Sequence, residues 1–139
     1  MTKRYPFLDL ASVNEPYMDE MCMAAQRVIR SGRYIGGDEV NDFQSELGRY
    51  LNVPHVVGVS NGLDALRLIL RALIELGRLT PGDKVVVPAN TYIASVLAIT
   101  DAGLTPVLVD PDPATLNITA QAISTAINTH SGIKAVMPV

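Results

Sequence analysis

Short runs rich in valine alternate with helical patterns from residue 54 to the end of the sequence. The runs are residues 55–59, 84–87, 106–109 and 133–139, and apolar patterns of helical period follow the first three in residues 63–73, 91–102 and 119–127. Strands that are buried on both faces lose the polar alternation of an exposed sheet. The sequence therefore predicts an α/β fold with a mostly parallel sheet and helices on both faces.

Two helices are expected before the first strand. The first begins at Glu15-Pro16 and ends at Ser31-Gly32, and Asp38 is expected to cap the second, after a glycine-rich loop at residues 33–37. We therefore expect a helical segment over residues 1–53 and the start of an α/β domain over residues 54–139, within a length that allows one domain. The apolar final run predicts that the chain is the N-terminal part of something longer.

Composition excludes several classes of protein. With 48% hydrophobic and 18% charged residues, the chain has the material for a packed core. No apolar run is long enough for a membrane span or a secretory signal, so we expect a cytoplasmic protein. The net charge of −3 and the scattered basic residues argue against nucleic acid as a partner.

The single Cys22 is expected to be a buried helix thiol. His55 and His130 are expected to be structural or surface residues, and no metal site is expected.

The turn at Ser60-Asn61-Gly62 is the strongest candidate for binding chemistry. A small-residue turn at a helix start presents backbone N–H groups to an anion, and Gly62 permits close approach. Asp64 argues the other way, because a carboxylate in the first turn also suits a helix start that binds nothing. Both interpretations stay open on this evidence. The glycine fingerprints of dinucleotide and nucleoside triphosphate sites are absent, which makes a Rossmann dehydrogenase a weak alternative.

The segment after the second run adds an aromatic side chain. In an open α/β sheet, ligands bind at the carboxyl ends of the strands, where Asn90, Thr91 and Tyr92 follow residues 84–87. Tyr92 could stack on a flat heterocycle or pack between helix and sheet, and spacing alone favours packing. Thr91 is expected to cap the next helix. Asp110 and Asp112 are expected to serve a loop and a helix start rather than a metal.

Several linked motifs resemble one family. The strings SNGLDALRLILRAL (residues 60–73), PGDKVVVPANTYIAS (81–95) and DAGLTPVLVD (101–110) resemble the DegT/StrS family of nucleotide-sugar aminotransferases, as does SGRYIGG at residues 31–37. Within that family, the sequences of these motifs are most similar to those of enzymes that aminate dTDP-linked 3-keto-6-deoxyhexoses. The resemblance covers nearly the whole chain.

The resemblance implies a fold type I, aspartate aminotransferase-like large domain, a pyridoxal 5′-phosphate (PLP) cofactor and a homodimer. The amides of Gly62, Leu63 and Asp64 would bind the cofactor phosphate, although Leu63 replaces a common threonine and so offers no hydroxyl. Tyr92 would stack on the pyridine ring, and the loop at residues 34–37 would lie near the active site. The complete enzyme would move an amino group, with glutamate as the expected donor, to a nucleotide-linked keto-sugar.

The catalytic lysine of the family is expected beyond the end of this sequence. That lysine forms the Schiff base in such enzymes, and none of Lys3, Lys84 and Lys134 matches its motif. The 139 residues alone are therefore expected not to transaminate. The alternative from a different class is a non-catalytic α/β module that binds a phosphate-bearing ligand or nothing.

Overall fold

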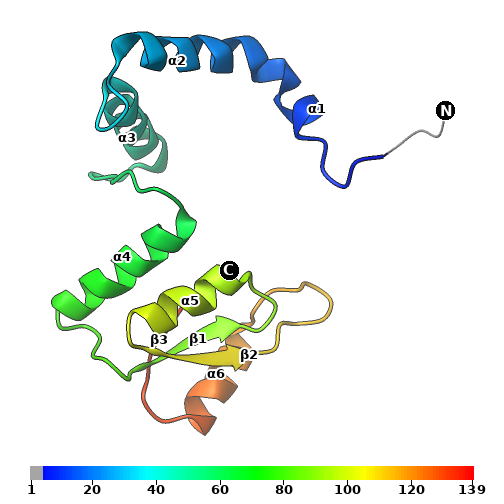
Figure 1. Ribbon diagram of the computed structural model, residues 1–139. Coiled ribbons are helices and arrows are strands. Elements are labelled where there is room, and N and C mark those ends of the chain that lie inside the picture. Colours follow the sequence, from blue (N-terminus) through cyan, green and yellow to red (C-terminus); the bar gives the residue numbers. More distant parts are fainter. Residues whose placement is uncertain (1–4) are drawn as a thin grey trace. The chain divides into compact units, whose positions relative to one another are not determined.

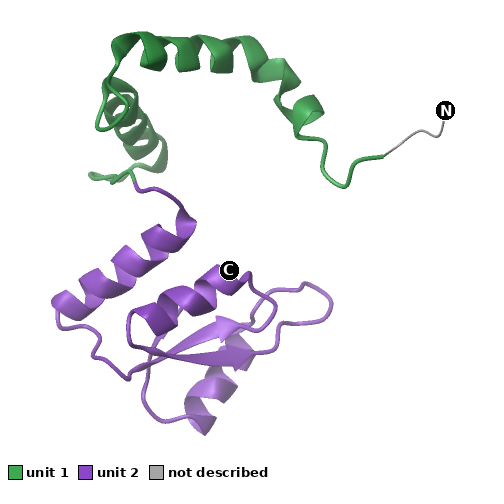
Figure 2. Cartoon of the chain, in the orientation of Figure 1, with its two compact units in different colours: residues 1–58 green, residues 59–139 purple. Residues whose placement is uncertain are grey.

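The computed structural model of the chain describes residues 5–139. The chain divides into two compact units, residues 1–58 and residues 59–139 (Figure 2). No helix within residues 5–139 has both the length and the apolar character that crossing a membrane requires.

The first unit is helical, as the sequence predicts for its two main helices. It contains α1 (Leu10–Asn14), the 3-10 helix η1 (Glu15–Tyr17), α2 (Met18–Ser31) and α3 (Asp38–Leu51). Gly32 ends α2 with a φ of 68°, which a glycine adopts without steric cost. The predicted cap of α3 was wrong: Gly37 is the cap residue, and Asp38 is the first residue of the helix, where its charge still suits the positive helix end.

The apolar faces of α2 and α3 are not buried. Neither helix contains a buried residue, and large side chains such as Met21, Ile29 and Phe43 are half or more exposed. The prediction of a buried thiol at Cys22 is therefore wrong, because this side chain is exposed on α2. The prediction assumed that an amphipathic helix packs its apolar face against a core, and the described residues supply none for α2.

The second unit is the α/β part of the chain. It contains α4 (Gly62–Glu75), β1 (Lys84–Pro88), α5 (Ile93–Asp101), β2 (Thr105–Val109), α6 (Ala120–Thr129) and β3 (Ile133–Val136). The three strands form a parallel sheet in the order β2-β1-β3, with Val86 of β1 beside Val107 and Val136. The predicted parallel sheet is confirmed, and β1 is its central strand.

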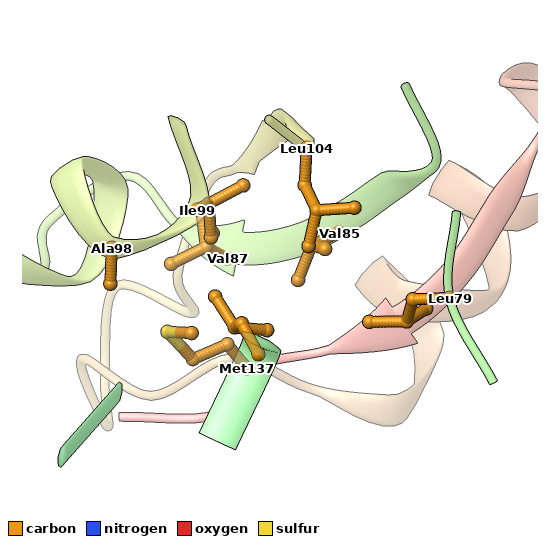
Figure 3. Close-up of a cluster of buried hydrophobic side chains, with 8 residues drawn as sticks. Leu79, Val85, Val87, Ala98, Ile99, Leu104 and Met137 are labelled. Carbon is orange, nitrogen blue, oxygen red and sulfur yellow. The ribbon is translucent and has the colours of Figure 1, made fainter. Parts of the chain in front are cut away.

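Helices cover both faces of this sheet. On one face, α4 and α5 pack over Val85 and Val87, and Figure 3 shows these side chains meeting Ala98, Ile99 and Met137 in one cluster. On the other face, which α6 covers (Figure 1), Val86 and Val107 pack with Ala126 of this helix. Successive side chains of β1 therefore point into two different cores, which explains why its sequence shows no polar alternation.

The predicted strand over residues 55–59 is absent. A strand must exchange backbone hydrogen bonds with a neighbour, and within residues 5–139 the three paired strands lie elsewhere in the chain. Val57 is 76% exposed, and the Gly58 N–H donates to the Gln44 side-chain oxygen at 2.7 Å instead of to a strand. Residues 55–59 thus have the β-branched composition of a strand but pair with no other strand within residues 5–139.

Candidate functional site

The carboxyl edge of the sheet gathers the candidate residues of the second unit. Because the strands are parallel, Pro88, Val109 and Val136 end at the same edge. The chain leaves α4 and enters β1 at the opposite edge, so α4 begins toward the carboxyl edge, and Figure 1 shows α4 and α5 beginning on the same side of this unit. The start of α4 and the segment 89–92 are therefore on one side of the fold, as the ligand sites of open α/β sheets are.

The first turn of α4 presents two backbone N–H groups without an acceptor. Asn61 is the cap residue, and its side-chain oxygen accepts from the Asp64 N–H at 3.0 Å, while its carbonyl accepts from the Ala65 N–H at 3.1 Å. Within residues 5–139, the N–H groups of Gly62 and Leu63 have no hydrogen-bond acceptor. The Asp64 amide, the third predicted contact, is occupied by the Asn61 side chain and would be free only if that side chain moved.

The Asp64 carboxylate is held by a network of neighbouring side chains. It accepts hydrogen bonds from Ser60, from Asn61 at 3.3 Å and from Arg67 at 3.2 Å. The Ser60 hydroxyl, followed by Arg67, holds the pKa of Asp64 below its ordinary value. Arg67 offsets the negative charge that argued against an anion at this turn. Arg67 is not among the residues predicted for this site, although its spacing of three residues from Asp64 on a helix was a usable signal.

Tyr92 is open to solvent. It is the cap residue of α5, with extended backbone dihedrals, and 79% of the residue is exposed. Packing between helix and sheet, which spacing alone favoured, is therefore wrong for this residue. The prediction that Thr91 caps α5 is also wrong, because its hydroxyl lies 2.8 Å from the hydroxyl of the buried Ser95. An exposed ring at this edge is available for stacking on a flat ligand.

The side chain of Asn90 has a structural role. Its side-chain N–H donates to the Leu116 carbonyl at 3.0 Å and so ties the end of β1 to the loop after β2. Leu116 has a φ of 58°, a strained value for a branched side chain, and this bond helps to hold it. The partner lies 26 residues away, so the sequence offered no local signal for the contact.

The remaining candidates are the acidic residues after β2 and the lysines. Asp112 accepts from the N–H groups of Ala114 and Thr115, which is the loop role expected for it. Within the described part of the chain, no three His, Cys, Asp or Glu side chains are grouped as a metal would require. Lys84 and Lys134 lie near the amino ends of their strands, and Lys3 lies outside the described residues.

The loop at residues 34–37 belongs to the first unit. Tyr34 is 67% exposed, and its hydroxyl donates to the Ile29 carbonyl at 3.4 Å. The neighbouring arginines are paired with carboxylates, Arg27 with Glu39 at 2.8 Å and Arg33 with Asp38 at 3.4 Å. These pairs bind Arg27 and Arg33 to carboxylates of the same unit, whereas Arg30, in the last turn of α2, makes no ion pair within residues 5–139.

The geometry at the start of α4 fits a phosphate and a flat ring. Two free N–H groups and the positive end of a 14-residue helix suit a phosphate. A Cβ built at Gly62 would meet nothing within 4 Å, so the backbone there is open to approach. Tyr92 offers an exposed aromatic face on the same side of the unit. The residues present are therefore compatible with the cofactor that the resemblance implies.

Several known proteins with similar sequences are named as sugar transaminases. The chain is 48% identical over 134 residues to dTDP-3-amino-3,6-dideoxy-alpha-D-galactopyranose transaminase of Aneurinibacillus thermoaerophilus, covering 96% of this chain and 35% of that protein. It is 47% identical over 110 residues to dTDP-3-amino-3,4,6-trideoxy-alpha-D-glucose transaminase of Streptomyces venezuelae, covering 79% and 28%. A UDP-2-acetamido-2-deoxy-3-oxo-D-glucuronate aminotransferase of Pseudomonas aeruginosa is 35% identical over 133 residues, covering 96% and 35%.

Solved structures agree with these relatives. The crystal structure of DesV from S. venezuelae matches 99% of this chain with a TM-score of 0.83 and 41% identity, and NtdA from Bacillus subtilis with bound cofactor PMP matches 99% with a TM-score of 0.81 and 29% identity. The chain covers 35% and 31% of these two structures, so it spans about a third of the length of its relatives. The fold is therefore part of a PLP aminotransferase fold, as predicted.

A family model describes most of the chain. The model of the DegT/DnrJ/EryC1/StrS aminotransferase family matches residues 17–139, which include both main helices of the first unit and the whole α/β unit. The motifs that carry the resemblance, the relatives and the solved structures agree on this assignment. The chain belongs to the DegT/DnrJ/EryC1/StrS aminotransferase family.

Proposed function

We propose that these residues form the cofactor-phosphate part of a PLP-dependent aminotransferase that acts on a nucleotide-linked keto-sugar. The observation that carries the proposal is the pair of free N–H groups at Gly62 and Leu63, at the start of the helix whose motif carries the family resemblance. In the complete protein these N–H groups would donate to the phosphate, and the Tyr92 ring would stack on the pyridine ring.

When bound, PLP supplies an electron sink that stabilises negative charge beside the transferred nitrogen. The residues described here bind and orient it. Gly62 and Leu63 fix the phosphate end, and the exposed Tyr92 ring limits rotation of the heterocycle. The lysine that would hold the cofactor covalently is proposed to lie outside residues 1–139, because Lys84 and Lys134 lie toward the other edge of the sheet.

A dTDP-linked 3-keto-6-deoxyhexose is the proposed substrate class. The two relatives named as dTDP-sugar transaminases are 47% and 48% identical to this chain, whereas the relative named for a UDP-sugar is 35% identical. Glutamate remains the proposed amino donor. The proposal includes the homodimer and the cytoplasmic location that the sequence analysis expects.

The test uses the full-length protein that carries these residues. We expect purified protein to bind PLP, which absorbance detects, and borohydride reduction followed by peptide mass spectrometry to locate the attached lysine outside residues 1–139. Attachment to Lys84 or Lys134 would contradict the proposed site. A protein that binds PLP no better than pyridoxal would favour the non-catalytic module instead.

A further inference from the structure

Arg67 connects the two helices that carry the proposed cofactor contacts. It lies in the second turn of α4, and its Nη1 donates to Asp64 Oδ1 at 3.2 Å. Its Nε donates to Asp101 Oδ2 at 2.8 Å, and its Nη2 donates to the same oxygen. Asp101 is the last residue of α5, the helix that Tyr92 caps. One guanidinium therefore binds a carboxylate on each of the two helices.

The same network reaches both sides of the free N–H groups. Asp64 accepts from Ser60 and Asn61, the two residues that precede Gly62, and its own N–H is held by Asn61 at 3.0 Å. Gly62 and Leu63 thus lie between Asn61 and Asp64, which hydrogen bonds connect to each other. The Asp64 carboxylate is in turn fixed to α5 through Arg67, so the direction of the two free N–H groups depends on this chain of bonds.

Arg67 also changes the charge at the turn. An isolated carboxylate in the first turn of α4 would repel a phosphate there. Asp64, Arg67 and Asp101 together carry one net negative charge instead of two, and the positive member lies between the carboxylates. Each of the three side chains is about two-fifths exposed, so water screens part of this interaction. We therefore infer that Arg67 acts on phosphate binding more by positioning the turn than by compensating the charge of Asp64.

We propose that Arg67 is a positioning residue for the cofactor phosphate, which acts by holding the turn at residues 60–64 against α5. It touches Asp64 and Asp101 and would reach the phosphate only through the turn. This inference rests on the proposed function. Binding groups must be held close to their productive geometry to be effective, and the side chains that hold them are supplied by neighbouring elements.

The chain offers a matched control on the same helix. Arg71 lies one turn after Arg67 on α4, is exposed, and makes no ion pair within residues 5–139. Its loss removes the same charge from the same helix without touching the turn. Lysine at position 67 is a second useful variant, because its single ammonium lacks the planar fork with which arginine binds two carboxylates.

The experiment compares two probes, PLP and pyridoxal, which differ only in the phosphate. Dissociation constants of the full-length protein for both are measured by absorbance or fluorescence titration. We expect Arg67→Ala to weaken PLP binding roughly 10-fold, as removal of residues that orient binding groups does at other sites, and to leave pyridoxal binding within about twofold. Arg67→Lys should lie between wild type and Arg67→Ala, and Arg71→Ala should match wild type.

The ratio of the two affinities separates the outcomes. A general loss of structure would weaken both probes alike, and that result would overturn the positioning role, as would an unchanged ratio in Arg67→Ala. If Arg67→Ala does not fold, Asp101→Asn removes the charge of the other end of the bridge and should lower the ratio in the same direction. Wild-type protein that does not prefer PLP to pyridoxal would instead refute the proposed function, and this inference with it.

Discussion

Replacing Gly62 with proline removes one N–H group from the proposed phosphate site and little else. Gly62 is the first residue of α4, where proline is favoured in helices because the N–H has no partner within the helix. Asn61 has a φ of −165° and a ψ of 174°, an extended conformation that suits the residue before a proline. The helix should therefore form normally in this variant.

The expected loss of affinity follows from the type of hydrogen bond. A bond to a charged group contributes about 1.5–3 kcal/mol, so loss of one N–H donor to phosphate should raise the PLP dissociation constant about 10- to 100-fold. Folding should not suffer, because a compatible proline restricts the unfolded chain and typically adds about 0.4–1 kcal/mol to the free energy of unfolding. The affinity for PLP is thus expected to fall while the free energy of unfolding rises.

The assay is PLP titration together with thermal unfolding of the full-length protein. Gly62→Ala is the control, because it keeps the N–H and its Cβ would meet nothing within 4 Å. We expect Gly62→Ala to lose less PLP affinity than Gly62→Pro, because it retains the N–H group and adds only one carbon atom beside the phosphate. Wild-type affinity in Gly62→Pro would refute the role of this amide, and equal losses in both variants would assign the effect to crowding by the added carbon atoms.

Three further predictions concern the ring, the core and pH. Tyr92→Ala should weaken PLP binding about 2- to 10-fold while Tyr92→Phe retains it, since the 79% exposed ring contributes stacking of about 0.5–1.5 kcal/mol and little to folding; unfolding at a clearly lower temperature would argue against this. Ile99→Ala, at a fully buried position, should lower the free energy of unfolding by about 2–5 kcal/mol in denaturant titration, and a loss below 1 kcal/mol would contradict its place in the core. Hydrogen bonds from the backbone and the hydroxyl of Thr80 lower the pKa of Asp83 from its ordinary value of 3.8. The stability that this carboxylate contributes should be fully present above the ordinary pKa and should be lost as the pH falls through the lowered pKa of the folded state. Asp83→Asn should remove this part of the pH dependence of the melting temperature.

The sheet could be predicted because its signal is local. In β1 the continuous valines are each buried, because a strand pairs with each edge of β1 and helices cover both faces of the sheet. The run at residues 55–59 carries the same β-branched signal but has no paired strand in the described chain. Composition reports the tendency of a segment to extend, whereas strand formation also requires a neighbour that is distant in sequence.

The site could be predicted only in part. The turn at Gly62 and the aromatic residue Tyr92 could be proposed as site residues because they lie in recognisable motifs. The cap of α5 is Tyr92 and not Thr91, and the 79% exposure of Tyr92 contradicts the packing interpretation, which spacing alone had favoured. The bond from Arg67 to Asp101 spans 34 residues, so only the folded structure reveals it.

Turnover by the full-length protein tests the central claim most directly. The protein is incubated with PLP, glutamate and a dTDP-linked 3-keto-6-deoxyhexose, and the amino-sugar product is measured by mass spectrometry beside a reaction with a UDP-linked keto-sugar. The account predicts amino-sugar formation that depends on PLP and glutamate and is faster with the dTDP-linked substrate. PLP-loaded protein that transfers no amino group to either keto-sugar would contradict it.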